Sequence, residues 1–493
     1  MDSFFFSKII VSVAMKKLYS IKIIFRTLAI MAILVVGIHV TQGYFYPIVL
    51  LPTLFALLMK KCESLFFWLF ISICLMVSNS TVVTKGVVFV ATIRALMVLV
   101  GCILAVQMIS QRKAWIIRPL LLILPFLLFE IFPSMTGWDP PISFMKLFLF
   151  TSIYLGFFSL ANLVTVDGGV RTEVIRSYML AFAIYFIWGS IVLLPFPALS
   201  QLRGEDAILY GTTSLLKGMT FHPQCLGPLV SSFAVLLLGD MLFSIKRFDW
   251  IYGLVLLPIP YLVYRTSSRT GMGAFIFGVL FVLFLFIRAK GIYRQWRGKV
   301  IFVFSLLGLV LTIVAISMPS IQQQVVEFAL KWDAEKPQGI ANISYEGILS
   351  SRQSLIDRSL YNFKSKPLCG NGFQVMEYMT SVKRTSLIAY LTAPVEKGVW
   401  ITAILEEGGI IGFVLFAGFV IYVLFSSIVH KAYIGVGLFG MMLLANLGEF
   451  TMLSMSSTGG VIWAMIFVGY AFDARRLNVE QMRGVWTGAS QWT

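Results

Sequence analysis

The segment that decides the fold is FIFGVLFVLFLFI, residues 275–287, which has no polar or charged side chain on any face. Apolar runs of about 17–25 residues recur along the chain, and an α-helix of this length crosses a hydrocarbon core of roughly 30 Å. A membrane-spanning β-barrel instead needs short segments in which apolar and polar residues alternate. The pattern therefore predicts an all-α polytopic membrane protein.

The composition agrees with a chain that lies in a bilayer. Hydrophobic residues make up 59% of the 493 residues and charged residues only 12%, and the mean hydropathy is +0.90. The net charge of +17 would also suit a nucleic-acid partner. However, Lys and Arg fall in short segments between apolar runs, where the positive-inside rule places them. We therefore expect a lipid bilayer, and no nucleic acid, as the partner of this charge.

The apolar runs predict about fourteen spanning helices. Alternation of the basic segments places both termini in the cytoplasm. Met15, which precedes Lys16-Lys17, is an alternative start, and nothing resembles a signal-peptide cleavage site. The predicted helix starts lie near Thr27, Tyr44, Ser64, Gly86, Trp115, Phe144, Arg176, Gln224, Trp250, Gly271, Val300, Gly398, Ala432 and Gly459.

The chain divides around one long external loop. Residues 319–397 are too long for a connector, and apolar residues recur at helical spacing near 325–330 and 355–363, so we expect two or more amphipathic helices over the outer mouth. The other parts are a cytoplasmic segment (1–26), the first and larger group of spanning helices (27–318), the remaining helices (398–473) and a cytoplasmic tail (474–493).

Two outer segments carry cations next to turns. In YRTSSRTG, residues 264–271, Arg265 and Arg269 would share one face if a helix begins there, and two arginine forks near a helix N-terminus suit a phosphate. The alternative is that both snorkel to lipid headgroups. In LKGMTFHPQCLG, residues 216–227, Lys217 can face a cavity and bind an anion there, and Arg203 is a weaker candidate for the same role. His222 is either a hydrogen-bonded cap or a catalyst.

Three further segments come from the large loop and its return to the membrane. Arg352 begins a helical stretch that ends at KPLCGNGF, residues 366–373, a rigid bend with free backbone amides. APVEKG, residues 393–398, contains Glu396 and Lys397, and LEEGGIIG, residues 405–412, contains Glu406 and Glu407. These glutamates are either counter-ions of the outer cations or part of the chemistry.

Some charges fall inside the apolar runs. Arg94, Glu130, Lys146 and Glu449 are predicted in the outer halves of their helices and Asp240 in an inner half. The four outer charges either pair with one another, or Arg94 adds to an anion site. Among the cysteines, Cys225 and Cys369 are placed on the outer side, where they either form a disulfide or stay unpaired.

The order of these segments resembles that of the bacterial O-antigen polymerase and O-antigen ligase family. The resemblance covers residues 217–412: the Lys217 segment, then SRTG (268–271), Arg352 with PLCGNGF (367–373), and EGGIIG (407–412). It implies a membrane glycosyltransferase with a glycosyltransferase C-like helical fold, no metal and no cofactor. The enzyme would act on undecaprenyl-pyrophosphate-linked glycans at the periplasmic face of the bacterial inner membrane, and a chain-length regulator and a flippase are candidate partners.

The resemblance also assigns roles to residues. Arg265, Arg269, Arg352, Lys217 and Arg203 would bind the pyrophosphate, with Arg269 and Arg352 stabilising its departure. His222, Arg94 and Lys397 are secondary candidates.

This chain departs from the ligases of the family, which carry a histidine where residues 398–399 are Gly-Val. Either Glu396 replaces it as the base that deprotonates the acceptor hydroxyl, or no protein base is used. This departure favours a polymerase over a ligase. A lipid-linked oligosaccharide flippase is the alternative from another class, and it would need its cations in a central cavity.

Overall fold

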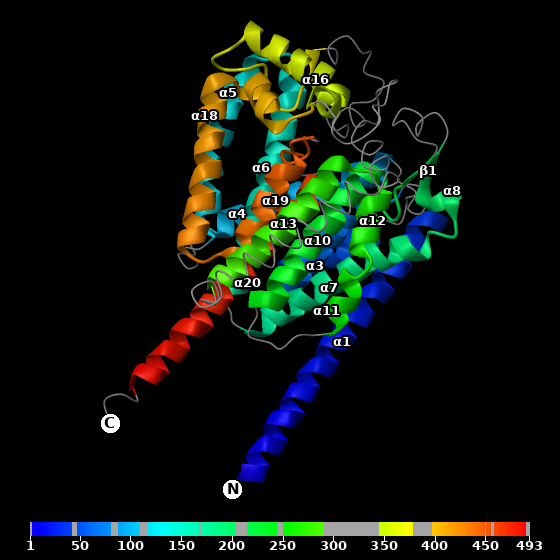
Figure 1. The fold of residues 1–493 in the computed structure, drawn as a ribbon, viewed down its shortest axis with the longest axis vertical. Coiled ribbons are helices and arrows are strands. Elements are labelled where there is room, and N and C mark those ends of the chain that lie inside the picture. The colour runs from blue at the N-terminus through cyan, green and yellow to red at the C-terminus, as the bar shows by residue number, and fades with distance from the viewer. Residues whose placement is uncertain are drawn as a thin grey trace, which may run out of the picture.

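The structure, a computed structural model, describes residues 2–41, 47–79, 87–108, 117–166, 169–203, 214–243, 250–289, 345–377, 397–448, 450–454 and 458–489. These residues are almost entirely helical (Figure 1). Their one sheet pairs β1 (Gln201–Arg203) with β2 (Ser214–Leu216) in antiparallel fashion. The all-α fold class is therefore confirmed for the described residues.

The helices before the sheet are α1 (Asp2–Val40), α2 (Pro47–Leu58), α3 (Cys62–Val77), α4 (Val87–Met108), the 3-10 helix η1 (Arg118–Ile123), α5 (Leu124–Thr136), α6 (Pro140–Val166), α7 (Gly169–Val192) and α8 (Pro197–Ser200). Those after it are α10 (Pro223–Phe243), α11 (Trp250–Leu256), α12 (Ile259–Arg265), α13 (Arg269–Ala289), α16 (Tyr345–Ser365), α18 (Trp400–Val429), α19 (Tyr433–Ala445) and α20 (Thr458–Ala489).

Seven helical segments within the described residues are long and apolar enough to cross a membrane, and five more apolar helices are shorter. The predicted number of about fourteen is therefore not confirmed. One cause is local: Pro258 separates α11 from α12, because proline lacks the N–H that a continuing helix needs. Another is length, since the 12 residues of α2 rise only about 18 Å. The helix predicted from Val300 lies outside the described residues.

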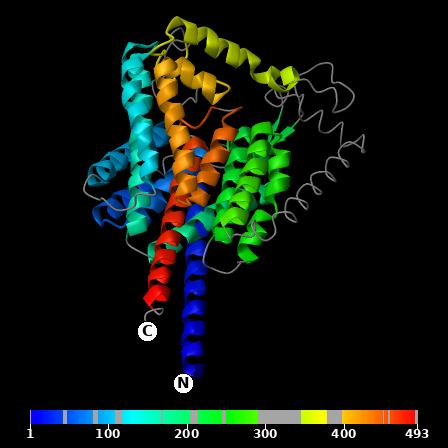
Figure 2. The ribbon, with the colours of Figure 1, turned by 60° about the vertical axis from the view of Figure 1, so that its left-hand side comes forward.

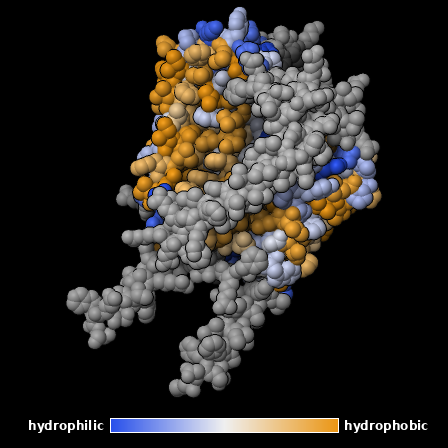
Figure 3. Space-filling view, viewed as in Figure 1, coloured by the Kyte–Doolittle hydropathy of each residue, from blue (hydrophilic) through white to orange (hydrophobic). Residues whose placement is uncertain are grey.

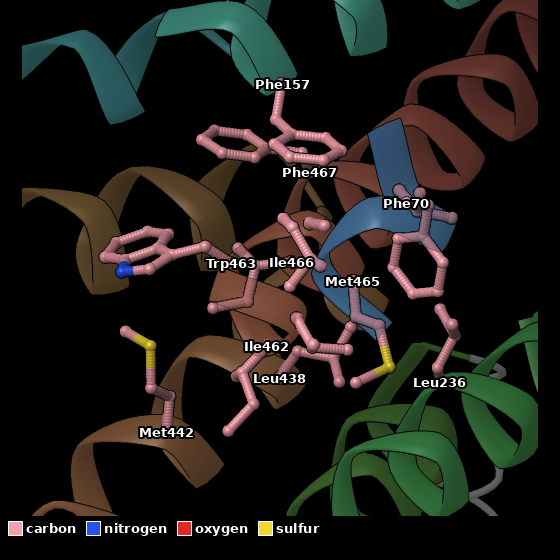
Figure 4. Close-up of a cluster of buried hydrophobic side chains, with 14 of the residues drawn as sticks. Phe70, Phe157, Leu236, Leu438, Met442, Ile462, Trp463, Met465, Ile466 and Phe467 are labelled. Carbon is pink, nitrogen blue, oxygen red and sulfur yellow. The ribbon is translucent and has the colours of Figure 1, made fainter. Parts of the chain in front are cut away.

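Helix α20 is the centre of the apolar core. Trp463, Phe467 and their neighbours on α20 meet Phe157 of α6 and Leu438 of α19 (Figure 4). Trp463 is fully buried, stacks against Phe467 and donates its indole N–H to the carbonyl of Met452 at 2.7 Å. Such aromatic packing fixes α20 against α3, α6, α10 and α19.

Opposite ends of the molecule carry different elements. The N-terminal end of α1 and the C-terminal end of α20 project from one end, and α16 lies across the other (Figures 1 and 2). Ion pairs tie elements near the termini together, such as Arg176 with Asp240 at 2.5 Å and Arg171 with Glu63 at 3.6 Å. The projecting ends of α1 and α20 lie at the same end of the molecule, and the cytoplasmic placement of both termini stays a prediction. Helices α1 and α20 run unbroken through the boundaries predicted at 26–27 and 473–474.

The outer sides of the bundle are apolar. Side chains of α18 such as Val414, Ile421 and Phe425 are 60–69% exposed, and Figure 3 shows a broad hydrophobic surface there, with hydrophilic side chains near α16 above it. A patch of this size on a water-exposed protein would lead to association, whereas in lipid it is the normal surface. This surface, together with the seven long helices, indicates a membrane protein.

Candidate functional site at the outer end

The SRTG motif caps the start of α13. Ser267 has a positive φ of 51°, which turns the chain sharply after α12. The hydroxyl of Ser268 then accepts a hydrogen bond from the backbone N–H of Gly271 at 3.0 Å, so Ser268 is the N-cap and Arg269 the first residue of α13. Arg265 is the last residue of α12. The two arginines therefore flank a turn between two helices, and the expectation that they share one face of a single helix is wrong.

This turn packs tightly on the start of α10. The hydroxyl of Ser231 donates to the carbonyl of Gly271 at 3.1 Å. A Cβ on Gly271 would come within 3.0 Å of the Cα of Gly227, and a Cβ on Gly227 would come within 3.0 Å of the Cβ of Ser268. Both glycines are needed because the two helix starts approach backbone to backbone. The N-termini of α10 and α13 thus lie side by side and add their positive dipole ends.

The segment before α10 is fixed mainly by its backbone. Lys217 is buried, its N–H donates to the carbonyl of Ser200 at 2.8 Å, and burial lowers its pKa below the ordinary value. Nδ1 of His222 accepts the backbone N–H of Gln224 at 3.2 Å, the geometry of a helix cap. This contact favours the cap interpretation of His222. The backbone of Arg203 pairs with Ser214 in the β1–β2 ladder.

Arg352 approaches Arg269 from a different part of the chain. It lies on α16, and its guanidinium is close enough to Arg269 for the two positive charges to repel each other. A Cβ on Gly398 would lie 3.2 Å from the Cβ of Leu355 and 3.9 Å from the carbonyl of Arg352, so the segment before α18 passes directly under α16. Arg352 thus lies within electrostatic range of Arg269, and its predicted approach to Arg265 stays a prediction. Glu396 lies outside the described residues, so its approach to Arg265 and Arg269 stays a prediction.

The PLCGNGF and EGGIIG motifs bind each other through their backbones. Helix α18 is broken at Gly409, whose φ of 62° and ψ of −162° are not helical. The amides of Asn371 and Gly372 donate to the carbonyls of Glu406 and Glu407, and the amides of Ile410 and Ile411 donate to the carbonyls of Pro367 and Leu368, all at 2.8–3.2 Å. The loop therefore supplies the hydrogen bonds that the broken helix lacks, as a buried break in an apolar helix requires.

The other side of this loop is held by the corner between α5 and α6. The amide of Trp138 donates to the carbonyl of Asn371 at 3.1 Å, and the hydroxyl of Ser143 donates to the carbonyl of Phe373 at 3.1 Å. Lys146 Nζ donates to the carbonyl of Gln374 at 3.0 Å. Residues 370–376 are buried. The prediction that this bend has free backbone amides is therefore wrong for residues 370–372, whose amides are all hydrogen-bonded, and this part of the bend is enclosed between α18 and the corner. Pro367 and Leu368 are exposed.

A buried ion network lies directly beneath the loop. Lys397 Nζ is 3.1 Å from Glu407 Oε1 and 3.5 Å from Glu406 Oε1, and Asn362 of α16 donates to Glu406 Oε1 at 3.1 Å. Burial alone would lower the pKa of Lys397, but the charges of the two glutamates outweigh it and raise the pKa above its ordinary value. Glu406 and Glu407 are therefore counter-ions, and their partner is Lys397.

Three of the charges predicted inside apolar runs lie around this network, namely Glu130, Lys146 and Arg94. Glu130 is fully buried, and a Cβ on Gly408 would come within 2.1 Å of its Oε1, so α18 has glycine where the carboxyl group lies. Lys146 is buried, within electrostatic range of both Arg94 and Glu407. The interaction of Arg94 with Lys146 is between like charges, so both the predicted pairing of the outer charges and the predicted contribution of Arg94 to an anion site stay predictions. Glu449 lies outside the described residues.

Of the two alternatives for Cys225 and Cys369, the disulfide is not formed in the structure. Cys225 is buried in the first turn of α10, whereas Cys369 belongs to the loop that covers the break in α18. The two thiols therefore belong to separate packing units of the outer end. No three His, Cys, Asp or Glu side chains of the described ranges form a group that could hold a metal ion.

A scan against protein-family models finds no match, and no curated protein matches the chain. The resemblance above therefore stands on residue order alone. Sequence reasoning missed the role of Asn362 and the pairing of Lys397 with Glu406. The available signal was a lysine followed, at the edge of an apolar run, by two adjacent glutamates, since buried charges need partners.

Proposed function

We propose that the chain is a membrane glycosyltransferase that polymerises undecaprenyl-pyrophosphate-linked oligosaccharide repeat units at the periplasmic face of a bacterial inner membrane. The observation that carries the proposal is the convergence of Arg269 and Arg352 at the end of the bundle opposite the termini. Two guanidinium groups within electrostatic range of each other create a positive field that suits a pyrophosphate, and each can hold phosphate oxygens with a bidentate contact.

The surroundings of the two arginines suit a pyrophosphate. Arg269 is the first residue of α13, where the helix dipole favours a negative group. Arg265 is exposed on the other side of the same turn, and Lys217 belongs to the segment that leads into the adjacent helix α10. Bidentate arginine contacts hold phosphate oxygens in a fixed orientation, which an ammonium group does not do as well.

In the proposed reaction the acceptor hydroxyl attacks the anomeric carbon of the donor sugar, and the bond to the lipid pyrophosphate breaks. Arg269 and Arg352 neutralise the negative charge that develops on the departing pyrophosphate. Glu396 takes the hydroxyl proton or positions the acceptor. Lys397 has a structural role in this scheme, because its charge is already balanced by Glu406 and Glu407.

Two other functions would use a similar anion site. A ligase would transfer the glycan to a different lipid acceptor, and a flippase would move the lipid-linked glycan without forming a bond. The position of the arginine pair speaks against the flippase, since a carrier needs its substrate site near the middle of the membrane. Arg269 is instead the first residue of α13, and Arg352 lies on α16, within the large loop.

The deciding experiment incubates the purified protein in liposomes with one defined undecaprenyl-pyrophosphate repeat unit. A polymerase gives a product ladder, a ligase gives a single transfer only when a second acceptor is added, and a flippase gives translocation without a new bond. Arg269→Ala and Arg352→Ala should abolish the ladder, and the lysine variants should restore little of it. Lys364→Ala, an exposed cation on the same helix as Arg352, is the matched control and should keep full activity. A complete ladder from both alanine variants would overturn the proposed site.

A further inference from the structure

One carboxyl group lies buried between α5 and the break in α18. Helices α5 and α18 pack against each other (Figure 1), and Glu130 of α5 is fully buried. A Cβ on Gly408 would come within 2.1 Å of Glu130 Oε1, and a Cβ on Gly412 would come within 3.0 Å of the same oxygen. Two glycines of α18 therefore leave the space that this carboxyl group fills.

The surroundings of this carboxyl group are apolar. Neither oxygen of Glu130 has a hydrogen-bond partner in the part of the chain that the structure describes. The rings of Phe126 and Phe129 lie beside it, since both come within 3.7 Å of the position that a Cβ on Gly412 would take. An isolated ionised carboxylate is strongly disfavoured in such surroundings, and the group takes up a proton instead.

The ion network beneath the loop does not supply a partner for Glu130. Its two groups that act on Glu130 are Glu407, which disfavours a negative charge there, and Lys397, which favours it. Lys397 Nζ, however, is held 3.1 Å from Glu407 Oε1 and 3.5 Å from Glu406 Oε1. The one ammonium group of this network is therefore already shared by two carboxylates.

The other elements packed on α5 are α6 and η1. The buried cation of α6 is Lys146, and its Nζ donates to the carbonyl of Gln374 at 3.0 Å. Arg118 of η1 is exposed. Neither cation provides a hydrogen bond to the carboxyl group of Glu130, whose oxygens have no such bond among the described residues.

We infer that Glu130 is a proton-binding site, whose carboxyl group keeps its proton near pH 7 and so leaves the contact between α5 and the break in α18 uncharged. An exposed glutamate is ionised at this pH. The proton is on Glu130 and not on Glu407, because Glu407 has a cation at 3.1 Å. Loss of the proton would bury an unpaired charge and favour separation of α5 from α18. The site is independent of the proposed function, since it involves neither arginine of the anion site.

Infrared spectroscopy detects such a proton directly, because a protonated carboxyl group has a C=O band above the amide bands and a carboxylate has none there. The full-length protein is measured in a detergent without ester groups. Near pH 7 the wild type should show one such band that Glu130→Gln lacks. Glu173→Gln, whose carboxylate is bound to Arg176 at 2.7 Å, is the matched control and should lose no such band. Identical spectra of the wild type and Glu130→Gln in this region would mean that Glu130 is ionised or holds a metal cation, and would overturn the inference.

Melting curves give a second measurement. The unfolded chain loses the proton of this glutamate near pH 4, whereas the folded protein keeps it. The wild type should therefore lose stability relative to Glu130→Gln as the pH rises from about 4 to about 7. A purely structural role of the side chain would give the same difference at every pH. A difference that does not change with pH would overturn the inference.

Discussion

Replacing Lys397 with methionine should lower the free energy of unfolding by about 3–5 kcal/mol, because two carboxylates would stay buried without their cation. Nζ of Lys397 lies 3.1 Å from Glu407 and 3.5 Å from Glu406. At an effective dielectric constant of about 20, each of these pairs attracts by roughly 5 kcal/mol. The three side chains are at most 1% exposed, so water screens this attraction little. The desolvation of the ammonium group offsets part of it.

The matched control is the triple variant Lys397→Met, Glu406→Gln, Glu407→Gln, which removes all three charges and keeps an acceptor oxygen for Asn362. It should recover most of the lost stability, because a buried neutral set needs no counter-ion. Thermal unfolding in detergent, followed by tryptophan fluorescence, compares the variants. A single variant as stable as the wild type, or a triple variant as unstable as the single one, would refute the buried ion network.

Three further predictions concern the same region. Gly409→Ala should lower the free energy of unfolding by at least about 1–3 kcal/mol, since the backbone angles of Gly409 are nearly exclusive to glycine and an added Cβ would come within 2.4 Å of Leu368. Gly418→Ala is the control and should not lower it, because the space around Gly418 is open. Equal unfolding temperatures of the two variants would contradict the prediction. Glu130→Gln should leave stability unchanged or raise it, because both carboxyl oxygens are buried without a hydrogen-bond partner; clear destabilisation in a melting curve would show that the charge is needed. The pKa of Lys397 is higher in the folded than in the unfolded protein, so protonated Lys397 stabilises the fold. This stabilisation is complete below the unfolded pKa of about 10.4 and is lost as the pH rises through the higher folded pKa. Melting curves of Lys397→Met at increasing pH should lack this loss of stability.

The ends of several helices could be predicted from the sequence because local signals mark them. Predicted starts near Gly398, Ala432 and Gly459 fall within two residues of Trp400, Tyr433 and Thr458, where α18, α19 and α20 begin. Glycine, polar or charged residues interrupt the apolar run at each of these places. Charge alternation also predicts which segments face the same side of a membrane, and this orientation stays a prediction.

The break in α18 could not be predicted, because its cause lies elsewhere in the chain. Residues 400–429 are one apolar run, and nothing in their periodicity marks Gly409 as non-helical. A helix breaks stably in such a place only if other groups satisfy its freed amides and carbonyls. Here the satisfying groups belong to residues 367–372. Only the excess of glycine in EGGIIG hinted at a close backbone contact.

The distance in sequence between residues that interact in the fold also explains why the roles of the charged residues could be predicted only in part. Glu406 and Glu407 were predicted to be either counter-ions of the outer cations or part of the chemistry, and sequence spacing cannot decide between the two roles. In the folded chain their cation is Lys397, which lies nine and ten residues before them in the sequence. Pairing in space depends on where α16 crosses the bundle, and this in turn depends on the break in α18.

The arginine site and the break in α18 are therefore one structural unit. The residues that accept the loop, Glu406 and Glu407, also carry the carboxylates that fix Lys397, and Glu406 anchors α16 through Asn362. A substitution that closes the break, such as Gly409→Ala, would displace the loop and with it the helix that carries Arg352. Such a change should lower both the free energy of unfolding and the affinity for the anion, although Gly409 carries no charge and does not contact the anion. This coupling explains why the motifs depend on one another in the fold, although they lie far apart in the sequence and each one alone is a weak sequence signal.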